Sequence, residues 1–342
     1  MLDAFLSFAE RVAPLSFLVG VGLLLGCGHW LVEGAVSIAR RLGMSTLLIG
    51  LTIVACGTSA PELFFNVAAA LSGSGDLSFG NVVGSNIANL GLVLGVAAFV
   101  APLAVHRSVL RRDLPMLIVA SVMLCGLAWL PASRPESAAH GFSRLDGVVF
   151  LVGFVLVLGT WAASAMRPGA GVPVDLEEVE STSERSLVAA SALFVAGLAG
   201  LVAGGKAAEI GAVGIAEWAG LSPALIGLTI VAVATSLPEV ATLVIAVRKG
   251  HTDLAVGNVV GSNLFNILFV LGATSLAGDV VLPRHGAWDL AVMMALTIGL
   301  WPLAASNGRQ VLRWQCGLLL VAWVLTMTAS VLREVLGTTP AG

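Results

Sequence analysis

Long apolar stretches alternate with short polar connections along almost the whole chain. Divided at charged or Pro/Gly-rich breaks, they predict ten spans, at residues 15–39, 45–71, 77–100, 114–130, 147–165, 187–216, 222–247, 254–277, 287–304 and 311–332. A helix needs ~20 mostly apolar residues to cross about 30 Å of hydrocarbon, and these stretches reach or approach that length. We therefore predict an all-α polytopic membrane protein with about ten transmembrane helices.

The composition supports this class. Of 342 residues, 58% are apolar and 11% charged, against roughly 45–50% and about 25% in soluble domains. A net charge of −3 without a basic cluster excludes a nucleic-acid surface. The four cysteines lack metal-ligand spacing, so we expect small buried residues. The first residues lack a basic region and cleavage site, so we expect no cleaved signal peptide.

The longest polar break, residues 167–185, carries five acidic residues and divides the predicted spans five and five. It lacks the alternating acidic pattern and central glycine of an EF-hand loop, so we expect a short cytoplasmic linker. The sequence thus predicts a first half at residues 1–166 and a second half at residues 186–342.

An internal repeat relates the two halves. Residues 50–95 and 227–272 align without a gap, and 26 of the 46 aligned positions are identical. The copies contain GLTIVACGTSAPE with GNVVGSNIANLGLVLG, and GLTIVAVATSLPE with GNVVGSNLFNILFVLG. Because each half has an odd number of spans, the second copy must cross the membrane in the opposite direction. Such inverted repeats are typical of secondary transporters.

The positive residues predict the orientation. With the N-terminus outside, eleven Lys and Arg residues fall in cytoplasmic connections and five outside, with Lys206 inside a span. The eleven are Arg40, Arg41, Arg107, Arg111, Arg112, Arg167, Arg185, Arg248, Lys249, Arg309 and Arg313. We expect both termini outside, in the inner membrane of a prokaryotic cell.

Two glutamates, Glu62 and Glu239, lie well inside apolar spans. Each carboxylate costs on the order of 2.5–3.5 kcal/mol at a helix centre on insertion scales, so a compensating role is expected. The spacing i, i+3, i+4, i+7 places further oxygen-bearing residues on the same helix face in each copy. These are Ala55, Thr58 and Ser59 with Glu62, and Ala232, Thr235 and Ser236 with Glu239.

Prolines precede both glutamates. Pro61 and Pro238 each remove a backbone N–H, which frees carbonyl oxygens that can coordinate cations. The following spans carry polar stripes at i, i+4 and i+8, namely Asn81, Ser85 and Asn89, then Asn258, Ser262 and Asn266. Hydrogen bonds between helices are an alternative role for these stripes. Four glycines, Gly80, Gly84, Gly257 and Gly261, predict close approach to the broken helices.

The inferred cavity combines two carboxylates with hydroxyl, amide and carbonyl oxygens. These hard ligands suit Ca²⁺ or Na⁺. Because one Ca²⁺ or two Na⁺ neutralise two negative charges, either ion set can relieve the same buried charge. This equivalence is a physical basis for exchange.

The paired GTSAPE/GNVVGSN and ATSLPE/GNVVGSN motifs resemble the α-repeats of the Ca²⁺/cation antiporter superfamily, closest to microbial sodium/calcium exchangers. The resemblance implies two inverted five-helix repeats, with broken helices at the ion site and no cofactor besides the transported ions. Carried over by position, the central cation ligands are Glu62, Asn89, Glu239 and Asn266. The resemblance assigns flanking sodium sites to Thr58, Ser59, Ser85, Thr235, Ser236, Ser262 and the carbonyls of Ala55 and Ala232.

Two positions depart from the family pattern. Asn266 stands where some relatives have Asp, which removes a titratable group and puts potassium dependence in question. Ala234 replaces the glycine matched by Gly57 in the first copy.

The leading hypothesis is an antiporter, not an enzyme, that extrudes Ca²⁺ in exchange for Na⁺ by alternating access. Proton/Ca²⁺ exchange by the same glutamates is the alternative, and a cation channel or an intramembrane hydrolase fits the motifs less well. The lipid bilayer is an expected partner, and protein partners cannot be inferred. Charged residues near span ends, Glu33, Lys206 and Glu209, are expected to be structural, and His29 is not expected to bind an ion.

Overall fold

The computed structural model describes residues 2–130, 140–165, 185–218, 233, 236–283 and 285–337. Nearly all of them are helical. The first half forms α1 (Leu2–Leu42), α2 (Thr46–Ile49), η1 (Gly50–Val54), α3 (Ala55–Thr58), α4 (Ala60–Leu71), α5 (Gly75–Ala88), η2 (Asn89–Val93), α6 (Leu94–Val100), η3 (Val109–Asp113), α7 (Leu114–Trp129) and α8 (Arg144–Ala165), where η marks a π-helical turn.

The second half repeats this order in the described residues. Its elements are α9 (Leu187–Trp218), α12 (Leu237–Arg248), α13 (Thr252–Leu264), η6 (Phe265–Val270), α14 (Leu271–Ala277), α15 (Gly286–Ala305) and α16 (Arg313–Gly337). The predicted linker at 167–185, apart from Arg185, lies outside the described residues, as does much of the predicted span 222–247.

Within the described ranges, eight helices are long and apolar enough to cross a membrane, and the bent pair Thr46–Thr58 and Ala60–Leu71 makes nine. The prediction of an all-α polytopic membrane protein is therefore confirmed. The largest boundary error is at the start, since α1 begins at Leu2 rather than near residue 15. Charged residues such as Asp3 and Glu10 end an apolar stretch without ending a helix.

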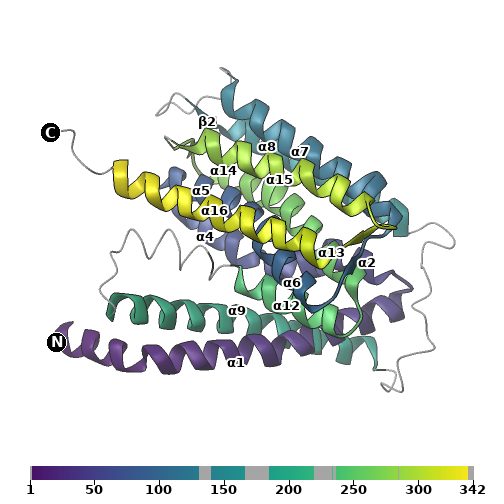
Figure 1. The fold of residues 1–342 in the computed structure, drawn as a ribbon, viewed down its shortest axis with the longest axis horizontal. Helices are drawn as coiled ribbons and strands as arrows, with labels where there is room; N and C mark the ends of the chain where they lie inside the picture. The colour runs from purple at the N-terminus through teal and green to yellow at the C-terminus, as the bar shows by residue number, and fades with distance from the viewer. Residues whose placement is uncertain are drawn as a thin grey trace.

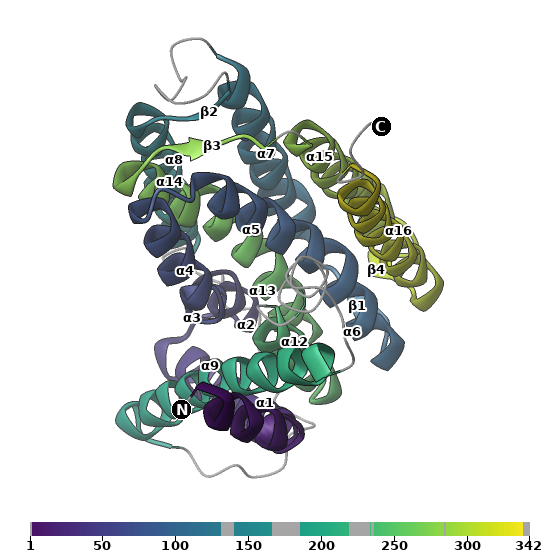
Figure 2. The ribbon, with the colours of Figure 1, turned by 90° about the vertical axis from the view of Figure 1, so that its left-hand side faces the viewer.

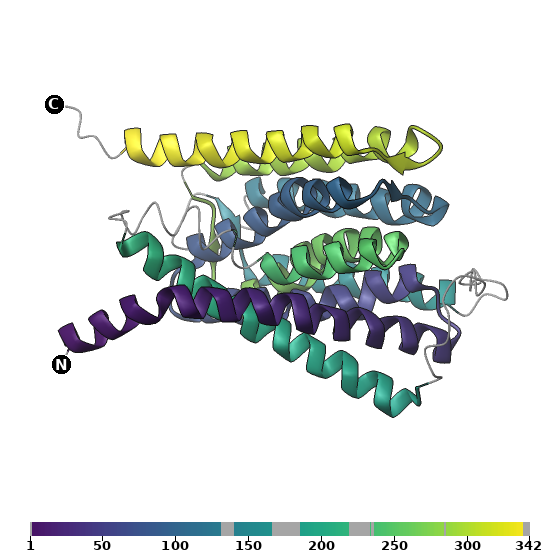
Figure 3. The ribbon, with the colours of Figure 1, turned by 60° about the horizontal axis from the view of Figure 1, so that its bottom comes forward.

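The helices pack in layers around α13. Figure 2 shows α13 near the centre, with α1 and α9 along one edge and α15 and α16 along another. The same pairs form the lowest and the highest layer in Figure 3. The span Thr252–Ala277, which contains α13, is the most deeply buried of the candidate spans.

Glycines bring α1 and α9 into backbone contact. A Cβ added to Gly20 would lie 2.3 Å from the Ala208 amide nitrogen, and one added to Gly197 would lie 2.4 Å from that of Leu31. Real Cβ atoms do not approach so closely, so larger residues would force the two helices apart. Small residues at helix interfaces in membranes allow this packing.

Two short antiparallel sheets join the halves. Strand β1 (Leu103–Ala104) pairs with β4 (Gln310–Val311), and β2 (Gly141–Phe142) pairs with β3 (Val280–Val281). Each sheet takes one strand from each half, and the two sheets lie near opposite ends of the long helices (Figure 1). The two halves are therefore tied together at both ends.

The cysteine prediction is only partly correct. Cys27 and Cys316 are buried and Cys125 is half-buried, but Cys56 is exposed. It follows the buried Ala55 on α3, and one residue of helix rotates a side chain by about 100°, which turns Cys56 away from the helix packing.

Candidate functional site

Each glutamate closely follows a serine that leaves helical geometry. Between α3 and α4, Ser59 leaves helical geometry at φ −89° and ψ 8°, and Pro61 lies in the first turn of α4. The second copy repeats this, with Ser236 at φ −90° and ψ 1° and Pro238 in the first turn of α12. Proline is tolerated there because its missing N–H would have no helical partner. The predicted break is confirmed in the first half, where the helices on either side are bent by 43°. In the second half the described residues show the start of α12 after Ser236, and the segment before Ser236 lies largely outside them.

The two glutamates lie in the first turns of α4 and α12. Glu62 is 2% exposed and Glu239 is 1% exposed. The N-terminal end of a helix carries a partial positive charge that favours a nearby carboxylate. The breaks therefore place the positive ends of two half-helices at the two buried carboxylates.

The two predicted amide ligands lie in π-helical turns. Asn89 begins η2 and Asn266 is the second residue of η6, and both are buried. A π-helical turn accommodates an extra residue and often occurs at functional sites. The i, i+4, i+8 spacing did not reveal these turns, because it is equally compatible with a continuous α-helix.

Most predicted ligands carry buried oxygen atoms without a hydrogen-bond partner in the described chain. These atoms are Ser59 Oγ, Glu62 Oε2, Asn89 Oδ1, Ser236 Oγ, Glu239 Oε1 and Oε2, Ser262 Oγ and Asn266 Oδ1. An unsatisfied buried polar group costs about 1–3 kcal/mol, and more when it is charged. Such a concentration of unpaired oxygens on two related helix pairs fits hard cations as the missing partners.

Thr58 and the carbonyl of Ala55 have partners within the protein. The Thr58 hydroxyl lies 3.4 Å from the Ala55 oxygen and 3.5 Å from Asn258 Oδ1, and the Ser59 amide donates to the Ala55 oxygen at 3.1 Å. These contacts are long, and a carbonyl oxygen has two lone pairs, so both groups keep capacity for a cation. Ser85 is also buried.

Part of the second copy lies outside the described residues. This applies to Ala232, Ala234 and Thr235, so the predicted roles of these three residues remain predictions.

The predicted close approach at four glycines can be tested at two of them. A Cβ on Gly261 would lie 2.4 Å from the Leu51 oxygen and one on Gly257 would lie 2.7 Å from the Leu47 oxygen, which confirms close approach. At Gly80 and Gly84, nothing in the described ranges lies within 4 Å of an added Cβ, so close approach there remains a prediction.

One supporting residue was missed in the sequence. Asn66 is fully buried, and its Nδ2 donates to the Glu62 carbonyl oxygen and to Asn81 Oδ1, both at 2.7 Å. Its position four residues after Glu62 places it on the same helix face, which was the available signal. Asn81 therefore forms a hydrogen bond between helices, whereas Asn89 on the same stripe keeps an unpaired oxygen.

The charged residues near the helix ends form ion pairs away from this set. Glu33 on α1 accepts from Arg185 Nη1 at 3.1 Å and from Lys249 Nζ at 2.9 Å. Lys206 and Glu209 pair with each other along α9 at 2.7 Å. These contacts agree with the structural roles expected from the sequence.

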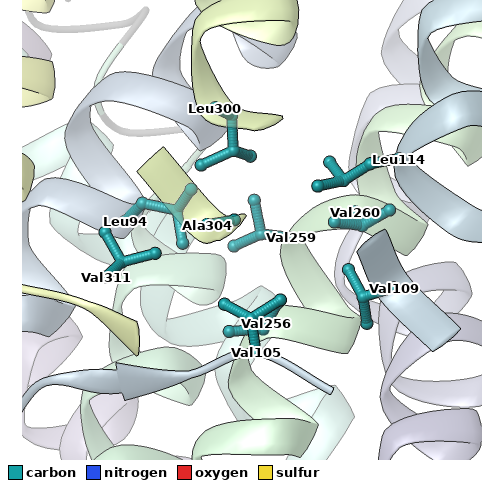
Figure 4. Close-up of a pocket in the computed structure, with 10 residues that line it drawn as sticks. All are labelled: Leu94, Val105, Val109, Leu114, Val256, Val259, Val260, Leu300, Ala304 and Val311. Atoms are coloured by element: carbon teal, nitrogen blue, oxygen red, sulfur yellow. The ribbon is translucent and has the colours of Figure 1, made fainter. Parts of the chain in front are cut away.

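A small cavity beside α13 has an entirely apolar lining, unlike the candidate ion site. Its lining consists of Leu94, Val105, Val109, Leu114, Val256, Val259, Val260, Leu300, Ala304 and Val311 (Figure 4). It offers no oxygen ligand from a side chain, so it is a packing defect rather than an ion site.

The chain is similar to known exchangers over almost its full length. A family model described as "Sodium/calcium exchanger protein" matches residues 12–161 and 189–332. The putative antiporter CaxA of Alkalimonas amylolytica is 40% identical over 317 residues, which cover 92% of this chain and 97% of CaxA. Sodium/calcium exchanger MaX1 of Methanosarcina acetivorans is 31% identical, over 91% of this chain and 96% of its own.

A solved structure shares the fold. The sodium-calcium exchanger NCX_Mj, soaked with 10 mM Na⁺ and zero Ca²⁺, superposes with a TM-score of 0.77 at 29% identity, covering 93% of this chain and 99% of that one. The broken helices, the inverted repeat and the extent of these matches lead to one assignment. The protein is a multi-pass membrane protein that belongs to the sodium/calcium exchanger family, a family of transporters.

Proposed function

We propose that the protein exchanges Ca²⁺ for Na⁺ across the membrane and that inward Na⁺ flow drives Ca²⁺ out. The observation that carries this proposal is the set of unpaired buried oxygens around Glu62 and Glu239. Two carboxylates supply a charge of −2, which one Ca²⁺ or two Na⁺ balance. An uncompensated ion in low dielectric is costly, so occupancy by either ion set is favoured over an empty or overfilled site.

The central ligands for Ca²⁺ are Glu62, Asn89, Glu239 and Asn266 in this proposal. Sodium occupies flanking positions at Thr58, Ser59, Ser85, Thr235, Ser236 and Ser262, with the carbonyls of Ala55 and Ala232. The amide oxygens of the two asparagines are hard, neutral ligands, which complete a coordination shell without adding charge.

The arrangement of α1 and α9 supports the alternating-access part of this proposal. Backbone contacts hold the two helices together at Gly20, Gly34, Gly197, Gly204 and Gly211. We propose that this pair slides as one body across the remaining helices and exposes the site first to one side and then to the other. Gly57, beside Thr58, lies against Leu198 of α9, which places the pair directly over the broken helix.

We propose that the protein lies in a prokaryotic inner membrane with both termini outside. One group of predicted cytoplasmic cations is held together by the Glu33 ion pairs and by the hydrogen bond from Arg41 Nε to the Arg185 oxygen. A second group surrounds the β1–β4 sheet. Both groups lie at the same end of the long helices (Figure 1).

Calcium flux in proteoliposomes tests the proposal, with Na⁺, H⁺ and K⁺ gradients imposed separately. A sodium gradient should drive calcium uptake, and a proton gradient alone should not. Uptake driven by pH alone would instead support proton/Ca²⁺ exchange, in which the two glutamates release protons as Ca²⁺ binds. Unitary currents without counterflow would reject both forms of exchange and favour a channel.

A further inference from the structure

The two short sheets have related backbones and different charges. At the β1–β4 sheet, Val105 donates its amide to the Arg309 oxygen at 2.8 Å, which places the connection after α6 beside the connection before α16. Arg107 and Arg111 follow one helical turn apart on the first connection. Three exposed arginines from the two halves therefore lie in the segments next to one small sheet.

These three guanidinium groups are exposed and unpaired. Arg107, Arg111 and Arg309 have no side-chain hydrogen bond or ion pair within the part of the chain that the structure describes. The fourth arginine nearby, Arg313, donates to the Val100 carbonyl oxygen at 3.2 Å, so its charge faces the end of α6 and is not neutralised. The sheet thus carries a concentrated positive charge.

The acidic residue nearest in sequence is not available to these arginines. Asp113 is fully buried, and it accepts from Arg112 Nε at 2.6 Å and from Trp161 Nε1 at 3.0 Å. Its two oxygens are occupied by Arg112 of η3, which also donates from Nη2 to the second oxygen at 3.1 Å, and by Trp161 of α8. The segments 101–112 and 305–333, which contain the two strands of this sheet, carry no acidic residue.

The opposite sheet provides an internal comparison. The exposed Asp279 directly precedes β3, and Asp146 follows β2 and accepts from the Ser143 amide at 2.8 Å. The exposed Arg144 lies in the same segment as Asp146, so this end carries charges of both signs rather than positive charge alone. The same backbone arrangement therefore does not require a basic surface, and the charge at β1–β4 needs its own explanation.

An anionic lipid headgroup is the partner that these features fit. Guanidinium groups bind phosphate oxygens through paired hydrogen bonds, and arginines near a membrane surface attract anionic lipids. Trp314, the neighbour of Arg313, is 61% exposed, and exposed tryptophans at helix ends lie at the level of the headgroups. We propose that Arg107, Arg111 and Arg309 form an anionic-lipid site, the β1–β4 patch, on the leaflet at this end of the protein.

Fluorescence quenching in nanodiscs tests this proposal. The probe is dibrominated phosphatidylglycerol, with dibrominated phosphatidylcholine at the same mole fraction for comparison. The difference between the wild-type protein and Trp314→Phe isolates the emission of Trp314. We expect phosphatidylglycerol to quench Trp314 more strongly, and the double variant Arg107→Gln/Arg309→Gln to lose most of this preference, about a tenfold or greater drop in relative affinity.

A matched double variant removes two exposed arginines from the same end of the protein but outside the patch. Arg40→Gln/Arg248→Gln should keep the preference for phosphatidylglycerol. Loss of the preference in both doubles would show a general effect of net charge and overturn the site. Equal quenching by the two lipids in the wild-type protein would also overturn it, and would leave the arginines with a role in membrane orientation alone.

Discussion

The two half-sites share their backbone but not their supporting hydrogen bonds. Ser59 and Ser236 break their helices with backbone angles that agree within a few degrees, and each glutamate follows in the first turn. In the first half, Asn66 ties the Glu62 backbone to Asn81. The aligned residue of the second half is Leu243, which can form no such bond.

This difference extends to the polar stripes. The carboxylates do not share it, since both Glu239 oxygens and Glu62 Oε2 are buried and unpaired within the described chain. Asn81 is held by Asn66, but Asn258 contacts Thr58 of the other half only at 3.5 Å and leaves its Nδ2 unpaired. The inverted repeat therefore duplicates the ligands, while the first half-site is the more firmly positioned.

The largest expected effect comes from removing either carboxylate, because the charge count is shared equally. Glu62→Gln and Glu239→Gln should each abolish calcium transport, because each removes the attraction between one carboxylate and the cation. A pair of opposite unit charges about 4 Å apart attracts by about 4 kcal/mol at an effective dielectric constant of 20. Flux assays with size-exclusion profiles would separate lost transport from misfolding. Near-normal calcium flux in a folded variant would remove that glutamate from the site.

Replacing Asn66 with Leu copies the second half-site into the first. It removes two buried hydrogen bonds and leaves Asn81 Oδ1 unpaired, at a cost of about 1–3 kcal/mol. We expect a calcium affinity reduced about fivefold to a hundredfold in concentration-dependent flux. Leu243→Ala, at the aligned position, is the control and should chiefly lower thermal stability. If Asn66→Leu lowers stability but not affinity, Asn66 does not position the site.

The α1–α9 pair is also asymmetric between its two ends. Glu33 joins α1 to Lys249 at the corner between α12 and α13, whereas Lys206 and Glu209 pair only within α9. Sliding of the pair must break the Glu33–Lys249 contact. Glu33 is about one-third exposed, so the contact contributes about 0.2–1 kcal/mol.

Glu33→Gln should therefore change the exchange rate about twofold to fivefold and leave calcium affinity unchanged. Glu209→Gln removes a carboxylate from the same helix pair and should leave the rate unaltered. Equal changes in the two variants would mean that the charge, rather than the contact with Lys249, matters.

The flanking hydroxyls should show a smaller and ion-specific effect. Thr58→Val and Ser236→Ala each remove one hydroxyl and keep both carboxylates, so the sodium dependence of transport should weaken more than calcium binding does. Sodium titrations of flux, compared with calcium binding measured by calorimetry, would test this. Equal losses for both ions would show that the sodium and calcium positions are not separable.

The smallest expected effect is that of potassium, for which we predict none. Asn266 is neutral, as is its counterpart Asn89, so two negative charges serve the whole site. Adding K⁺ beside Ca²⁺ would leave an unbalanced positive charge. Sodium-driven calcium uptake should run at similar rates in K⁺ or choline at clamped voltage, and a several-fold potassium dependence would contradict the charge count.

The sequence predicted the fold class, the helix break before Glu62 and the helix start before Glu239 because each has a strong local signal. Apolar length marks the spans, and Pro61 and Pro238 mark the breaks. The π-helical turns at Asn89 and Asn266 have no comparable signal, since they depend on how these helices pack against their neighbours. The β1–β4 and β2–β3 pairings join residues far apart in the chain, and two-residue strands leave no readable period.

The candidate site follows the same rule. Glu62 and Glu239 stand out because a charge in an apolar span is conspicuous. Asn66 does not stand out, because a single amide four residues from a glutamate is also common as a bond between helices. Its role became visible only from its two partners, Glu62 and Asn81.

The glycine contacts between α1 and α9 bear on which helix contacts can slide in the proposed transport movement. The backbones of α1 and α9 are in direct contact at Gly20 and Gly197, so sliding of one helix along the other would cause steric clashes at every helical turn. On the other face, contacts with the remaining helices are made by side-chain ends, such as Ile245 against Gly28 and Pro238 against Gly205. The Ile245 methyl group can rotate aside, and the Pro238 ring faces a glycine without a side chain. In the proposed sliding movement, we therefore expect less resistance along this second contact surface than between α1 and α9.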